Sequence, residues 1–166
     1  MFEFAANITR DLHPISVHFP IGLLALSFGL SLASRGRPAL NECSWIALIL
    51  GGIAAIISVV TGLEAHEAYE QTPLIEYIKP HQMLGLFGAG GVWLVIAWRF
   101  VSRGKGVDAG RQPYYMAIAA AGLVWLVLLG GTGSNLVFSH GANVRGVNPL
   151  LAPAKPDDQF VPDTLP

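Results

Sequence analysis

The stretch WIALILGGIAAIISVVTGL, Trp45–Leu63, decides the fold of this chain. It holds no charged residue, and a helix of about 18–20 apolar residues crosses the hydrocarbon core of a bilayer. Three further runs have the same character: Pro14–Ser34, His81–Trp98 and Pro113–Phe138. Because the runs are continuous and lack the alternation of barrel strands, the sequence predicts an all-α protein, a bundle of four transmembrane helices.

The composition agrees with a membrane protein, because 52% of the 166 residues are hydrophobic and only 13% are charged. About a quarter of the residues in soluble domains are charged. We expect residues 1–12 to form an outer interfacial segment, 13–148 the four-helix membrane domain and 149–166 a proline-rich outer tail. No phosphate loop, dinucleotide fingerprint or Ser/His/Asp pattern is present, and we expect no nucleic-acid partner.

The distribution of charge predicts the topology. The loops after the first and third runs hold six basic residues against two acids, whereas the other side of the membrane holds four basic residues against nine acids. The six are Arg35, Arg37, Arg99, Arg103, Lys105 and Arg111. By the positive-inside rule these loops are cytoplasmic. The stretch Met1–Leu12 lacks the basic start of a cleaved signal peptide. The sequence therefore predicts a multi-pass protein of a bacterial inner membrane with both termini in the periplasm.

Five histidines lie on the outer side in this topology: His13, His18, His66, His81 and His140. Four of them stand at the end of a helical stripe of small residues. The strings His18-x-x-x-Gly22 and His81-x-x-x-Gly85 also begin similar segments. We therefore expect two tandem helical hairpins, related by a pseudo-two-fold axis along the membrane normal.

Stripes of small residues either let helices pack closely or leave room for a flat group such as a porphyrin. Imidazole is a usual axial ligand of haem iron, and four-helix bundles hold such cofactors in their cores. We therefore expect one or two b-type haems, with no covalent attachment because Cys-x-x-Cys-His is absent. The candidate cofactor-binding residues are His18, His66, His81, His140, His13, Gly22, Gly62, Gly85, Gly88 and Gly133, of which the first four are the candidate metal ligands.

His13 precedes Pro14, and the residue before a proline is biased away from helix. We therefore expect its ring to point along the membrane surface instead of into the bundle, and to matter less for a cofactor than the other four.

Two motifs resemble those of a large family of predicted four-helix bacterial membrane proteins of unknown function. They are Leu12-His13-Pro14-Ile15-Ser16-Val17-His18-Phe19-Pro20-Ile21 and Val137-Phe138-Ser139-His140-Gly141. Members of that family typically begin His-Pro-x-x-Val-His-Phe-Pro, and some are joined to, or occur beside, c-type cytochrome modules. The resemblance covers roughly residues 12–145. It implies the four-helix topology, and it adds weight to a role for haem b in redox work.

The leading hypothesis is a b-type cytochrome-like membrane subunit that carries electrons between membrane quinone and a periplasmic redox partner such as a c-type cytochrome. We expect an electron-transfer part of a larger membrane complex instead of a self-contained enzyme. Two alternatives stay open. One is a membrane copper or zinc site. The other is a cofactor-free structural or assembly subunit, in which the glycines only pack helices.

Overall fold

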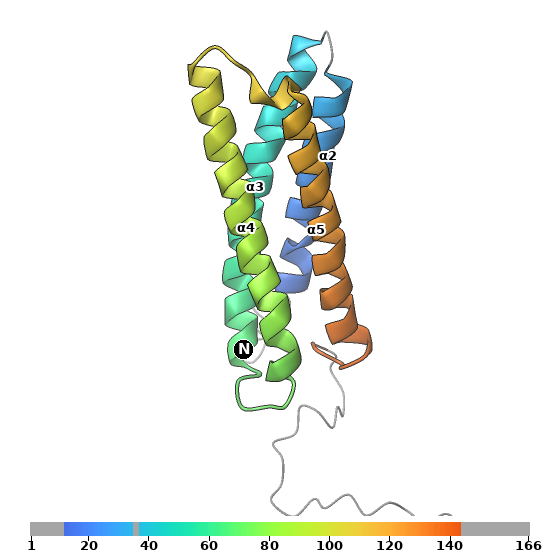
Figure 1. Ribbon diagram of the computed structural model, residues 1–166. Helices are drawn as coiled ribbons and strands as arrows, with labels where there is room; N and C mark the ends of the chain where they lie inside the picture. The colour runs from blue at the N-terminus through green and yellow to red at the C-terminus, as the bar shows by residue number, and fades with distance from the viewer. Residues whose placement is uncertain (1–11, 35–36, 144–166) are drawn as a thin grey trace, which may run out of the picture.

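Four long helices make up the fold of the computed structural model, which describes residues 12–34 and 37–143 (Figure 1). They are α2 (His18–Ala33), α3 (Pro38–Glu67), α4 (Ile75–Gly104) and α5 (Pro113–Phe138), with the short 3-10 helix η1 (Ala109–Arg111) before α5. Within these ranges there is no strand, so the prediction of an all-α protein is confirmed. Apart from Leu12, the segments expected at 1–12 and 149–166 lie outside the described residues.

All four helices are long and apolar enough to cross a membrane. The first helical span begins ahead of α2, at Leu12, and runs to Ala33. The second and third spans are longer than the uncharged runs in the sequence, because their ends carry polar residues such as Asn41 and Glu64. Such ends reach the lipid–water interface, so each uncharged run is the centre of a longer helix.

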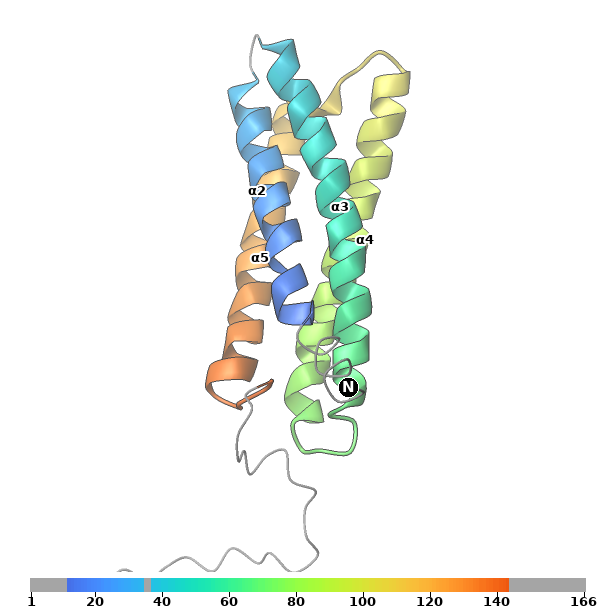
Figure 2. The ribbon, with the colours of Figure 1, turned by 180° about the vertical axis from the view of Figure 1, so that it is seen from behind.

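The helices form a closed ring in which each packs on the next and α5 returns to α2 (Figures 1 and 2). The α2–α3 pair is the most extensive. Ser27 Oγ donates to the carbonyl of Ser44 at 2.9 Å, and Ser44 Oγ donates to that of Ser27 at 3.0 Å. Small polar residues let membrane helices approach closely and hydrogen-bond to each other.

Two tryptophans join the other helices at mid-depth. The indole N–H of Trp93, on α4, donates to the Gly52 carbonyl of α3 at 3.1 Å. The indole N–H of Trp125, on α5, donates to the Leu84 carbonyl of α4 at 3.1 Å. An indole N–H at the depth of a membrane has no water to donate to, so these two bonds help to fix how the helices lie against each other.

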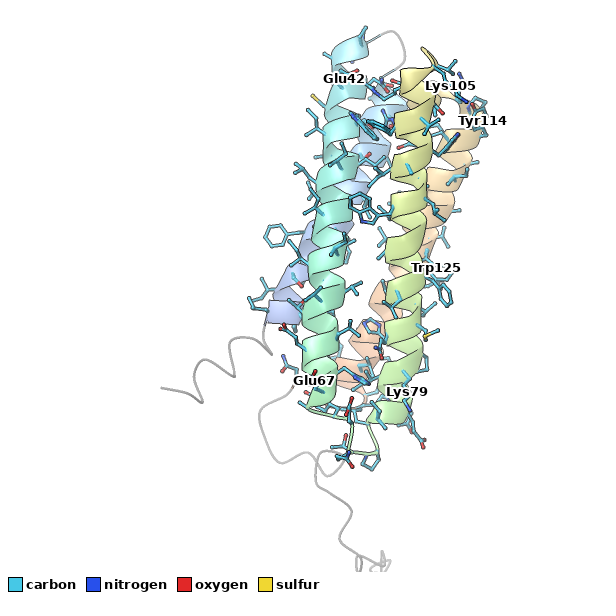
Figure 3. All side chains as sticks on the ribbon, turned by 90° about the vertical axis from the view of Figure 1, so that its left-hand side faces the viewer. Glu42, Glu67, Lys79, Lys105, Tyr114 and Trp125 are labelled. Atoms are coloured by element: carbon cyan, nitrogen blue, oxygen red, sulfur yellow. The ribbon has the colours of Figure 1, made fainter. Side chains whose placement is uncertain are left out.

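The two ends of the bundle differ in chemistry. One end, here called the histidine end, is formed by the start of the first span, the C-terminus of α3, the N-terminus of α4 and the C-terminus of α5. All five histidines lie toward it, as predicted. The opposite end, here called the arginine end, holds Arg99 and Arg103. Figure 3 shows Glu67 and Lys79 at the histidine end and Glu42, Lys105 and Tyr114 at the arginine end.

Candidate functional site

His13 and His81 meet inside the histidine end of the bundle. Their ring centroids lie 6.4 Å apart and the ring planes are inclined by 76°. The first span supplies His13 and the third supplies His81, and these two spans lie diagonally across the ring of helices. The pair therefore spans the interior of the bundle.

His13 is held by the second span. Its Nδ1 lies 2.9 Å from the carbonyl oxygen of Ser58 and 3.5 Å from Oγ1 of Thr61. A Cβ built on Gly62 would stand 2.8 Å from Cε1 of the His13 ring. Real Cβ contacts are not that short, so the ring occupies space that only a glycine leaves open.

His81 is held by the fourth span in the same way. Its Nδ1 lies 2.8 Å from Oγ1 of Thr132, which itself donates to the carbonyl of Leu129 at 2.8 Å. A Cβ on Gly133 would stand 3.1 Å from Cε1 of His81. Each hairpin thus places one imidazole against a Thr-Gly pair, Thr61-Gly62 in the first and Thr132-Gly133 in the second.

These contacts fix which ring nitrogen carries the hydrogen. The Ser58 carbonyl can only accept, so Nδ1 of His13 donates to it. The Thr132 hydroxyl has its hydrogen on the Leu129 carbonyl, so it accepts from Nδ1 of His81. In both neutral rings Nε2 then carries the lone pair. Metal-binding histidines are usually oriented in this way, with the other nitrogen donating to an oxygen.

The prediction that His13 would point along the surface is wrong. Leu12 and His13 are helical, and Pro14 lies in the first turn, where its missing N–H breaks no intrahelical bond. The register expected for the two hairpins is also wrong. His13, and not His18, occupies the place in the first hairpin that His81 occupies in the second.

The other three histidines have different environments. His18 is exposed on α2. His66 is half-buried in the last turn of α3, and its Nδ1 lies 3.9 Å from Oε1 of Glu70. The His140 ring stacks on Tyr77, with centroids 3.9 Å apart and planes inclined by 25°.

The candidate glycines separate into two groups. Gly62 and Gly133 lie against the histidine pair, and Gly88 lies against Trp125, whose Nε1 would be 2.8 Å from an added Cβ. At Gly22 and Gly85 an added Cβ would meet nothing within 4 Å. The packing of the described residues therefore requires a residue without a side chain at Gly62, Gly88 and Gly133, and makes no such demand at Gly22 and Gly85.

A buried arginine at the opposite end is the largest feature that the sequence reasoning missed. Arg99 was predicted to be a loop residue, but it lies within α4 and its side chain is completely buried. Its NH1 donates to Ser44 Oγ and to the Tyr115 hydroxyl, both at 3.1 Å. Its NH2 donates to the side-chain oxygen of Asn41 at 3.0 Å. The available signal was the set of polar partners, since Asn41 and Ser44 stand just before the predicted second span and Tyr115 stands at the start of the fourth.

Asp108 neutralises this charge. Its Oδ1 lies 3.6 Å from Nε of Arg99, and its Oδ2 accepts from Asn41 and, at 3.1 Å, from Arg103. Burial acts to raise the pKa of Asp108, but the Asn41 amide, the Gly110 N–H and the two guanidinium groups outweigh it, so the pKa is lowered. The arginine end is therefore closed by a paired and hydrogen-bonded charge.

Within the described part of the chain, no three His, Cys, Asp or Glu side chains come together as a metal site. A structural zinc site takes four protein ligands and a catalytic one three. The histidine pair alone therefore suits a metal whose remaining ligands come from elsewhere, as they do in a porphyrin.

Comparison with known proteins gives one match. A family model described as "Predicted membrane protein (DUF2231)" matches residues 9–146. No curated protein and no solved structure matches the chain. The matched range includes all four spans and all five histidines. The chain therefore belongs to this family of predicted membrane proteins, DUF2231.

Proposed function

We propose that the protein is a b-type cytochrome-like membrane subunit in which His13 and His81 bind one haem between the four helices. The observation that supports the proposal is the pair of imidazoles whose centroids lie 6.4 Å apart, each held through Nδ1 and each with a lone pair on Nε2. Bound haem would supply one-electron redox chemistry.

The spacing of the pair fits such a group. Two metal–imidazole bonds of about 2.0–2.1 Å, together with the distance from each nitrogen to its ring centre, would allow the two centroids to lie at most roughly 6 Å apart. The observed separation is 6.4 Å. The ligands also come from two diagonal helices, the arrangement in which a bundle holds a cofactor in its core.

The protein's own residues have separate tasks in this proposal. The Ser58 carbonyl and the Thr132 hydroxyl hold the two imidazoles in the tautomer that can bind a metal. Gly62 and Gly133 leave space for the rings. The sequence suggested His18, His66 and His140 as further ligands. The geometry favours His13 over His18 as the partner of His81, and a second haem stays a prediction without this support.

We also propose a membrane and an orientation for the protein. The charge distribution favours a bacterial inner membrane, with the histidine end and both termini toward the periplasm. Electrons would then pass between membrane quinone and a periplasmic redox protein, such as a c-type cytochrome, near the outer surface. In this role the protein would be one subunit of a larger membrane complex.

An optical spectrum tests the proposal. Protein expressed with added haem and purified in detergent is expected to show a Soret band and one iron per chain. His13→Ala and His81→Ala are expected to abolish the band, since each removes a ligand. His18→Ala, a matched change of an exposed histidine, is expected to keep it. A wild-type protein without a Soret band refutes the haem assignment.

A cofactor-free structural subunit is the second candidate. The same hydrogen bonds from His13 and His81 would then only join neighbouring spans, as polar residues do between membrane helices. This candidate predicts a colourless protein that loses thermal stability in the two alanine variants. A copper or zinc site predicts a colourless protein or a weak copper spectrum, with the metal found by elemental analysis.

A further inference from the structure

His66 has a buried nitrogen that no described residue hydrogen-bonds. Its Nε2 is buried and makes no hydrogen bond within the described part of the chain. Its Nδ1 lies 3.9 Å from Oε1 of Glu70, which is longer than a hydrogen bond. A buried donor or acceptor left unpaired is unfavourable by about 1–3 kcal/mol, so such an atom in a folded protein calls for an explanation.

The position of His66 relates this nitrogen to the histidine pair. His66 follows Gly62 by four residues, so the two lie on one face of α3, about one turn apart. Gly62 is the residue on which the His13 ring rests. His66 therefore lies in the last turn of α3, about one turn farther than Gly62 toward the histidine end of the bundle.

The three rings differ in where their hydrogen can lie. The Nδ1 atoms of His13 and His81 are committed as donors, which leaves lone pairs on Nε2. Nδ1 of His66 is not committed in this way, because Glu70 is too distant for a hydrogen bond. Its hydrogen is free to reside on Nε2. The partners of the first two rings thus leave Nε2 as the metal-binding nitrogen, whereas the third ring can carry its hydrogen on Nε2.

We propose that His66 Nε2–H anchors a carboxylate of the bound porphyrin. The inference rests on the proposed function, since haem b carries two propionate groups on one edge of its ring. Carboxylates avoid the membrane core, so that edge would face the end of the bundle. His66 lies on this side of the ligand pair and offers a buried donor, for which a charged acceptor is the most favourable partner.

The experiment compares haem with its dimethyl ester, in which both propionates are blocked. Wild-type protein made without added haem is titrated in detergent with each compound, and the Soret change gives the dissociation constant. Wild type is expected to bind haem about tenfold or more tightly than the ester, the effect of one hydrogen bond to a charged group.

His66→Ala is expected to remove this preference. Binding of haem falls to the level of the ester, while binding of the ester stays unchanged, which also shows that the variant is folded. His66→Gln keeps an N–H donor and is expected to retain part of the preference. His18→Ala, at the same end of the bundle, is expected to retain all of it.

Two results overturn the inference. One is equal affinity of wild type for haem and ester, and the other is a preference that survives in His66→Ala. If wild type binds neither compound, the haem assignment itself fails, and the titration separates that outcome from a misplaced carboxylate.

Discussion

Gly110 lies directly against the guanidinium of Arg99. A Cβ built on Gly110 would stand 2.5 Å from Cζ and from NH2 of Arg99. The end of a free arginine side chain would move aside, but this one is fixed by hydrogen bonds to Ser44, Tyr115 and Asn41. The loop after α4 can therefore cover the arginine only where residue 110 has no side chain.

Gly110→Ala is expected to lower the free energy of unfolding by about 1–3 kcal/mol, the usual effect of overpacking a buried site. Thermal unfolding in detergent measures the change. Gly104→Ala is the control, because a Cβ there meets nothing within 4 Å. Equal stability of the two variants would show that the arginine has room to move.

Acid is expected to destabilise the protein through Asp108. The folded pKa of this carboxyl is lowered from the ordinary value of 3.8. Its contribution to stability is therefore fully present above pH 3.8 and is lost as the pH falls through the lower folded pKa. Asp108→Asn removes the titrating group. The stability difference between wild type and this variant should be constant from pH 7 to about 4 and shrink below it. A difference that does not change in acid would contradict a pKa of Asp108 lowered by Asn41, Gly110 and the two arginines.

Gly62→Ala is expected to reduce haem content severalfold. The new Cβ would stand 2.8 Å from Cε1 of His13 and would displace the ring from its bond to Ser58. Gly104→Ala, at the arginine end of the bundle, is the control, since nothing lies within 4 Å of its added Cβ. The ratio of Soret absorbance to protein measures the content. Equal ratios in the two variants would exclude His13 as a ligand.

Thr132→Val is expected to weaken haem binding by about 10–100-fold, the usual effect of removing the group that orients a ligating histidine. Valine keeps the shape of threonine but cannot accept from Nδ1 of His81. Thr132→Ser keeps the hydroxyl and is expected to bind almost as wild type does. Haem titration with absorbance detection compares the two, and equal weakening in both would mean that the hydroxyl does not orient the ring.

The fold was predictable because the membrane imposes it. Only a helix satisfies its backbone within an uncharged run such as Trp45–Leu63, so run length alone identified the spans. Because successive spans alternate in direction, the order of the four spans also predicted that all five histidines lie at one end of the bundle. None of this required knowledge of which helices touch.

The candidate site was less predictable, because it depends on contacts across the bundle. The register of the two hairpins was predicted from the similar sequences that begin at His18 and His81. In the structure the corresponding residues are His13 and His81, each of which lies against a Thr-Gly pair on the next helix. The two pairs, Thr61-Gly62 and Thr132-Gly133, are visible in the sequence. They can be linked to the histidines only when it is known which helices are in contact. Arg99 was missed for the same reason, since a positive charge at the end of a span is usually exposed.

The burial of Arg99 also bears on the order in which the chain is assembled. The residue precedes Asp108 and Tyr115 in the sequence, so the third helix is synthesised before two of its partners exist. Until they arrive, the guanidinium is better placed at the membrane surface, where its long side chain reaches water. The third helix can therefore reach its final position only after the fourth has been inserted, and a chain truncated before Tyr115 cannot complete the bundle.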